Sequence, residues 1–88
     1  MVKSYVLIKT QAGKEDKVLR DLGAMNVVEE AHKVFGEFDI VAEVRARDME
    51  AIVEVVTERI RKVEAIEDTQ TLLVIDLELD MTSTGLAN

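Results

Sequence analysis

The residues best suited to chemistry lie in the segment Gly36-Glu37-Phe38-Asp39. Backbone amides near Gly36 can donate hydrogen bonds to a carboxylate, and the carboxylate of Asp39 can accept them from an ammonium group. Amides and an acid within one short turn are what the two charged groups of an α-amino acid require. The hydroxyls of Thr69 and Thr71 can add hydrogen bonds from the start of the last predicted strand. These residue types favour binding of a small molecule at the turn.

Few residues in the chain are of the types that catalysis or metal binding requires. The chain has one His and no Cys, which excludes disulfides, thiolate zinc sites and Cys nucleophiles. His32 lies on a predicted edge strand, and we interpret it as a surface residue. The segment from Gln11 to Lys14 offers only a Lys where acyl-phosphate hydrolysis would want an Arg, and no glycine-rich phosphate loop occurs. We therefore predict no enzyme activity, no metal and no cofactor.

Composition limits the class of protein further. The chain has 88 residues, 48% of them hydrophobic, which indicates one domain. A domain this small buries only about 60–65% of its unfolded surface, so we expect self-association. The net charge of −7 disfavours direct binding to nucleic acid. Because neither a signal peptide nor an apolar run of about 20 residues is present, the expected location is the cytoplasm.

The periodicity of hydrophobic residues predicts the secondary structure. Alternation with period two predicts four strands, over residues 2–10, 27–35, 38–47 and 69–79. Apolar residues at helical spacing predict helices over residues 14–22 and 49–63. We expect Asp48 to be the N-cap of the second helix and Gly23 to be a left-handed C-cap of the first. Residues 1–80 then form one domain, followed by a short polar tail over 81–88.

The resulting β-α-β-β-α-β order determines the fold class. Right-handed crossovers turn this order into a ferredoxin-like α+β fold, a four-stranded antiparallel sheet with both helices on one face. The first strand is apolar on both faces and is predicted to be central; the second is more polar and is predicted to be an edge.

Apolar side chains remain on the sheet face opposite the helices. The first strand contributes either Tyr5 and Leu7 or Val6 and Ile8 to that face, depending on its phase. An uncovered apolar sheet face usually marks an interface, so we predict a dimer packed sheet against sheet as an α+β sandwich. The residues assigned to the interface are Tyr5, Leu7, Val41, Leu72 and Val74.

Two segments resemble a known family. Gly36-Glu37-Phe38-Asp39-Ile40 resembles the G-x-aromatic-D-aliphatic turn in the effector-binding domain of the Lrp/AsnC (leucine-responsive and asparagine-responsive) transcription regulators. Residues 63–74 resemble the family's second signature, a helix end that leads into T-x-T and an aliphatic strand. The resemblance covers residues 2–79, and the two motifs occur in order within the expected fold.

The resemblance implies an amino-acid-sensing module that is dimeric through its sheets, with dimers assembling into tetramers or octamers. In the family, effectors bind at the junction between dimers, held by the Gly-to-Asp turn and by the last strand. Carried over by position, the ligand-binding residues are Gly36, Phe38, Asp39, Thr69 and Thr71. Glu37 fills the variable position of the turn, where it can tune specificity.

One departure from the family pattern is large. Full members carry an N-terminal helix-turn-helix domain, whereas this chain begins at the first predicted strand. The resemblance is therefore to the stand-alone form of the domain, and DNA binding is not carried over. We expect any role in transcription to be indirect, through co-assembly with a DNA-binding relative, or else a role as the amino-acid-responsive partner of an enzyme.

Three other interpretations stay open. An ACT domain places its effector near a Gly of the first strand–helix turn, where this chain has Gly13, so separate mutation of Gly13 and Gly36 distinguishes the two modules. A small dimeric α+β barrel enzyme, such as a cofactor-free monooxygenase, would have His32 as its only candidate base. A structural module that assembles and binds nothing is separated from the sensor only by a binding measurement.

Overall fold

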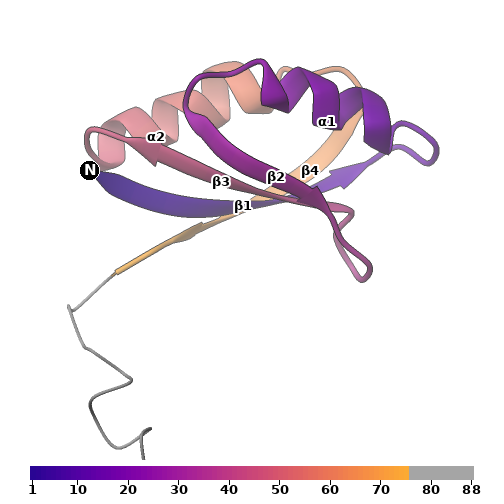
Figure 1. The fold of residues 1–88 in the computed structure, drawn as a ribbon, viewed down its shortest axis with the longest axis horizontal. Helices are drawn as coiled ribbons and strands as arrows, with labels where there is room; N and C mark the ends of the chain where they lie inside the picture. The colour runs from indigo at the N-terminus through magenta and orange to yellow at the C-terminus, as the bar shows by residue number, and fades with distance from the viewer. Residues whose placement is uncertain (76–88) are drawn as a thin grey trace, which may run out of the picture.

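A computed structural model of the chain describes residues 1–75 and has the predicted element order. The elements are β1 (Val2–Thr10), α1 (Glu15–Gly23), β2 (Val28–Lys33), β3 (Ile40–Ala46), α2 (Met49–Val55), the π-helical turn η1 (Val56–Ile60) and β4 (Ile66–Leu73). The four strands form an antiparallel sheet in the order β2-β3-β1-β4, and both helices cover the same face (Figure 1). The ferredoxin-like prediction is confirmed, as are the central position of β1 and the edge position of β2.

The core lies between the helices and the two central strands. On β1 the side chains of Val6 and Ile8 are buried, and on β3 every second residue from Ile40 to Ala46 is buried. The helices add the buried residues Val18, Leu22, Ile52, Val55, Val56 and Ile60. Because Val6 and Ile8 face the helices, Tyr5 and Leu7 occupy the opposite face. Neither helix within residues 1–75 is long and apolar enough to cross a membrane.

The pairing of β4 with β1 contains one irregularity. Ile8 lies opposite Thr69 and Lys9 opposite Asp68, but Thr10 lies opposite Ile66. Glu67 is therefore an extra residue, as in a β-bulge. The bulge allows Ile66 and Thr69 to face the same side of the sheet although they are an odd number of residues apart.

The second helix differs from its prediction. One helix was expected over residues 49–63, but α2 ends at Val55, η1 ends at Ile60, and Val63 lies in the following turn. Thr57 Oγ1 donates a hydrogen bond to the carbonyl oxygen of Val53 at 2.8 Å. Such side-chain bonding to the preceding turn loosens a helix, and the β-branched residues around it weaken the helix further.

One of the two predicted caps is present. Asp48 accepts a hydrogen bond from the Ala51 amide at 2.8 Å, and this bond holds the pKa of the Asp48 carboxyl below its usual value. The prediction for Gly23 was wrong, because Gly23 is the last residue of α1 and the following Ala24 is right-handed with φ −83°. The amides of Ala24 and Met25 reach back three residues, to Asp21 and Leu22, and satisfy helix carbonyls without a left-handed residue.

The strand bounds also differ at several ends. The first strand matches its prediction, but β2 and β3 are shorter than predicted because residues 34–39 form a wide connection. The last strand begins at Ile66, three residues before the predicted Thr69. The predicted end of that strand at residue 79 and the predicted tail over 81–88 lie outside the described residues.

Two glycines give stability predictions of opposite sign. A Cβ on Gly13 or on Gly23 would meet no atom within 4 Å, so backbone conformation alone decides the outcome. Gly23 is helical, and Gly23→Ala should raise the free energy of unfolding by about 0.5–1 kcal/mol. Gly13 has φ +83°, and Gly13→Ala should lower it by roughly 1 kcal/mol. Urea denaturation at one fixed protein concentration measures both, and changes of equal sign would contradict this account.

Candidate functional site

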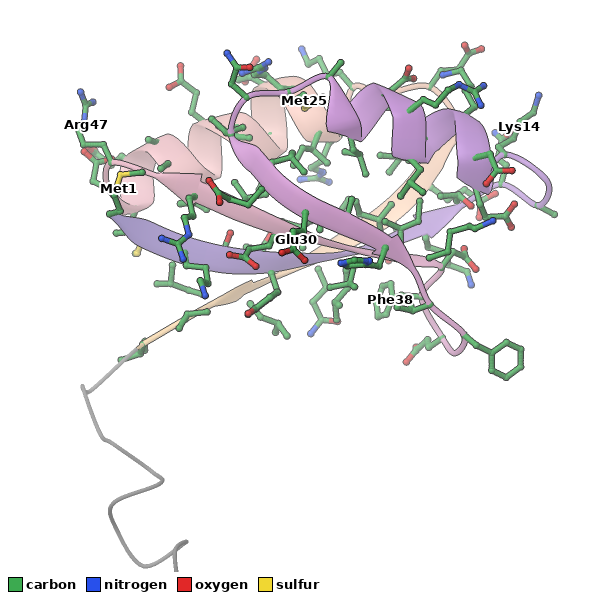
Figure 2. All side chains as sticks on the ribbon, viewed as in Figure 1. Met1, Lys14, Met25, Glu30, Phe38 and Arg47 are labelled. Atoms are coloured by element: carbon green, nitrogen blue, oxygen red, sulfur yellow. The ribbon has the colours of Figure 1, made fainter. Side chains whose placement is uncertain are left out.

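The connection between β2 and β3 projects beyond the end of the sheet (Figure 1). The Val34 amide donates to the carbonyl oxygen of Asp39 at 2.9 Å and closes this connection. Gly36 adopts φ +154°, a conformation that side-chain-bearing residues rarely take, so the turn favours glycine at this position. Phe35 is fully exposed, whereas Phe38 is half-buried beside the base of the connection (Figure 2).

Asp39 attaches this turn to the end of β1. Its backbone amide donates to the carbonyl oxygen of Ile8 at 2.8 Å. Its Oδ2 accepts from the Thr10 amide at 2.9 Å and lies 3.5 Å from Thr10 Oγ1. Within residues 1–75, Asp39 Oδ1 accepts no hydrogen bond. One carboxylate oxygen therefore holds the turn in position, and the other is available to a ligand.

A second contact supports the turn from the side. The Nζ of Lys9 donates to the carbonyl oxygen of Glu37 at 3.2 Å. Sequence reasoning missed both Lys9 and Thr10. Thr10 did carry a signal, since it continues the buried alternation of Val6 and Ile8, and a buried hydroxyl needs a partner.

Thr69 and Thr71 lie on the helix side of β4, because their partners in β1 are the buried residues Ile8 and Val6. They border a hollow between α2 and β4 of about 250 Å³, here called the α2–β4 hollow. Its apolar floor and polar rim are formed by Ile52, Val53, Val56, Thr57, Arg61, Thr69 and Thr71. Gln70 lies opposite Leu7 and faces the other side of the sheet.

The hollow contains two polar residues that sequence reasoning did not assign to it, Thr57 and Arg61. Arg61 was interpreted only as a cation near a helix C-terminus. Its presence in the hollow depends on where η1 ends, and the periodicity of the sequence carried no signal for that end.

The predicted ligand-binding residues form two sets in one chain. Gly36, Phe38 and Asp39 belong to the turn, and Thr69 and Thr71 to the α2–β4 hollow. Asp39 and Thr69 approach β1 from opposite sides at the same residue, Ile8. The backbone of β1 lies between them, and two strand spacings amount to about 10 Å. The two sets therefore do not converge within a single chain.

The five residues predicted to form a dimer interface share the sheet face that the helices leave uncovered. Tyr5 lies opposite Leu72, and Leu7 lies opposite Val41. The Val74 amide donates to the carbonyl oxygen of Lys3 at 3.0 Å, which continues the β4 pairing. Charged residues border the patch: Lys3 lies 3.6 Å from Glu43 and 5.8 Å from the centre of the Tyr5 ring. The arrangement is a group of apolar residues with polar neighbours, because Glu43 pairs with Tyr5 and Gln70 with Leu7.

The positions that the alternative interpretations require are less well formed. His32 is exposed, and its Nε2 lies 2.9 Å from Glu30 Oε1. No group of three His, Asp or Glu side chains in residues 1–75 is arranged to hold a metal. Near Gly13 lies a hollow of about 150 Å³ lined by Gln11, Lys14, Lys17, Glu64 and Ala65. That hollow is smaller than the α2–β4 hollow.

Comparison with known proteins agrees with this geometry. The sequence profile of the Lrp/AsnC ligand binding domain matches residues 3–83. The chain is 25% identical over 81 residues to the HTH-type transcriptional regulator FL11 of Pyrococcus furiosus, across 92% of this chain and 53% of FL11. It thus spans about half the length of that relative.

Solved structures share the fold. The crystal structure of FFRP-DM1 matches with a TM-score of 0.82 and 39% identity, across 85% of this chain and 100% of FFRP-DM1. The transcriptional regulator NMB0573 of Neisseria meningitidis, solved as an L-Met complex, matches in fold with a TM-score of 0.78 at 17% identity, across 97% of this chain and 56% of NMB0573. The fold, the two motifs and the sequence profile agree, and the chain belongs to the Lrp/AsnC ligand-binding domain family.

Proposed function

We propose that this chain is a non-enzymatic regulatory domain that binds a free α-amino acid and self-assembles through its sheet. The observation that carries the proposal is the free Oδ1 of Asp39 in a turn that matches the family motif. An acid positioned by its other oxygen, next to a glycine turn, suits the ammonium and carboxylate of an amino acid. The NMB0573 structure contains L-Met, which supports the same class of ligand.

The ligand is held between two copies of the chain. The ammonium and carboxylate of an amino acid are bonded to one carbon, so the groups that bind them must lie close together. Within one chain β1 lies between Asp39 and Thr69. A turn from one copy facing the threonines of another removes this obstacle, in keeping with the inter-dimer effector position that the family resemblance implies.

The regulatory output follows from assembly. A ligand held between copies favours the assembled state by its binding free energy, so its concentration controls the size of the oligomer. We place the chain in the cytoplasm, in tetramers or octamers built from dimers. Co-assembly with DNA-binding relatives is the route by which it acts on transcription, without contacting DNA itself.

The direct test is a thermal-shift screen of the purified chain against the twenty proteinogenic amino acids. A ligand that binds the native state raises the melting temperature by mass action. We expect a concentration-dependent rise with one or a few of them. No rise with any amino acid up to millimolar concentration would contradict the proposed ligand class and favour a module that only assembles.

Two variants of Asp39 distinguish the effect of its charge on ligand binding from its role in positioning the turn. In Asp39→Asn the amide oxygen still accepts from the Thr10 amide, so the unliganded melting temperature should stay near wild type. Loss of the charge should weaken binding of the amino acid found in the screen by about 2–3 kcal/mol, measured by calorimetry. Asp39→Ala should lower both affinity and stability. Wild-type affinity in Asp39→Asn would mean that Asp39 only positions the turn.

The sheet interface is tested at Val74. A Lys at this position would leave an unpaired charge buried between the two sheets, which costs about 3–5 kcal/mol. Val74→Lys should therefore convert dimers into monomers in light scattering. Met49→Lys, on the exposed side of α2, is the matched control and should leave the dimer intact. An unchanged oligomer in Val74→Lys would reject the sheet-to-sheet arrangement.

A further inference from the structure

The α2–β4 hollow differs in charge from the chain as a whole. The chain has 18 acidic and 11 basic residues, and its net charge is −7. Among residues 1–75, however, no Asp or Glu lines the hollow, and one of the lining residues is a cation, Arg61. The other lining residues are Ile, Val and Thr. An apolar floor with one cation and several hydroxyls suits an anionic group on an apolar stem.

Acidic side chains on the bordering elements do not line the hollow. Glu50, Glu54 and Glu58 line the outer surface of α2 and η1 instead. On β4, Asp68 lies opposite Lys9 and therefore faces the side of the sheet away from the helices. The helix thus presents its acids to the outside and apolar or hydroxyl-bearing side chains to β4.

Arg61 has no anionic partner in the described part of the chain. It directly follows η1, so it lies at the end of the hollow where the chain turns toward β4. Its guanidinium forms no ion pair within residues 1–75, and Glu58 Oε1 lies 3.6 Å from the Nζ of Lys62 instead. A guanidinium is a rigid fork that binds a carboxylate through two parallel hydrogen bonds. The hollow therefore contains a cation whose geometry matches a carboxylate.

Two of the three threonines in the hollow can donate to an anion. Thr57 Oγ1 donates to the carbonyl oxygen of Val53 at 2.8 Å, so its proton is already used. The hydroxyls of Thr69 and Thr71 form no hydrogen bond within residues 1–75. Since β4 faces α2 across the hollow, these two hydroxyls lie on the wall opposite the helix. Together with the guanidinium they can satisfy the oxygens of one carboxylate.

We infer that the α2–β4 hollow takes the side chain of the bound amino acid, and that Arg61 selects a side chain ending in a carboxylate, as in glutamate. The inference rests on the proposed function for the presence of an amino acid, whose ammonium and α-carboxylate are held by the turn over residues 34–39. The apolar floor contacts the methylene groups, and the volume of about 250 Å³ admits such a side chain. Glutamate is favoured over aspartate because a longer methylene stem buries more apolar surface.

The experiment compares glutamate with glutamine, which have nearly the same shape and differ in the charge of the side chain. In calorimetry on the wild-type chain, glutamate should bind at least tenfold more tightly than glutamine. Arg61→Gln should weaken glutamate binding roughly tenfold to hundredfold and leave glutamine near its wild-type affinity. Arg61→Lys should keep only part of the preference, because an ammonium group lacks the guanidinium fork.

The matched control is Lys62→Gln. This variant loses the same charge at the neighbouring residue, which does not line the hollow, so it should keep the wild-type preference for glutamate. Urea denaturation should give Arg61→Gln wild-type stability, because Arg61 is exposed and makes no ion pair within residues 1–75. That measurement separates a lost ligand contact from a lost fold.

The possible outcomes distinguish the inference from the proposed function. A wild-type chain that binds glutamine as tightly as glutamate, or an unchanged preference in Arg61→Gln, would overturn the inference. Equal weakening of every amino acid in Arg61→Gln would place Arg61 on the α-carboxylate and would also overturn it. A thermal shift with aliphatic amino acids alone would reject the carboxylate side chain and leave the proposed function standing, whereas no shift with any amino acid would reject both.

Discussion

The position of β1 in the middle of the sheet is the constraint on which the other features depend. It pairs with β3 on one side and β4 on the other, and its helix-facing side chains form the floor of the core. Both candidate sets are attached to it at Ile8, the turn through the Asp39 amide and the hollow through Thr69. The residue that fixes the two sets in space is thus also the residue that keeps them apart.

The proposed function divides the surfaces of the chain between two kinds of contact. The uncovered sheet face carries Tyr5, Leu7, Val41, Leu72 and Val74, with Glu43 and Gln70 beside them, and it is the face that we propose for the symmetric interface. The turn over residues 34–39 and the α2–β4 hollow are small, and they are the parts that we propose to contact the ligand. A domain of this size has few buried residues to spare, and placing regulation in small contacts leaves the core untouched.

Much of the fold was predictable because one face of each central strand is buried without interruption. The alternation in β3 continues through its buried residues from Ile40 to Ala46, whereas the sequence left the phase of β1 open. The register places Leu72 opposite Tyr5, as the predicted interface requires. Helix ends were less predictable. The carbonyls at the end of α1 can be satisfied by a left-handed glycine or by hydrogen bonds from amides three residues on, and Thr57 can bond to Val53 or to water. These alternatives differ in free energy by about 1 kcal/mol, which residue spacing does not reveal.

The site was predictable in residue type but not in arrangement. The family motif identified Gly36, and its φ of +154° is a backbone conformation that favours glycine. The partner of Asp39 at Thr10 and the presence of Arg61 in the hollow are tertiary facts, which spacing along the chain does not encode.

The extra residue Glu67 has a consequence for how such a domain changes over evolutionary time. Deleting that residue would put Ile66 and Thr69 two positions apart in a regular strand, so Thr69 and Thr71 would keep their partners in β1 and still face the helices. The strand can therefore lose this one residue without exchanging its two faces, and what the extra residue adds is a local bend at the end of β4.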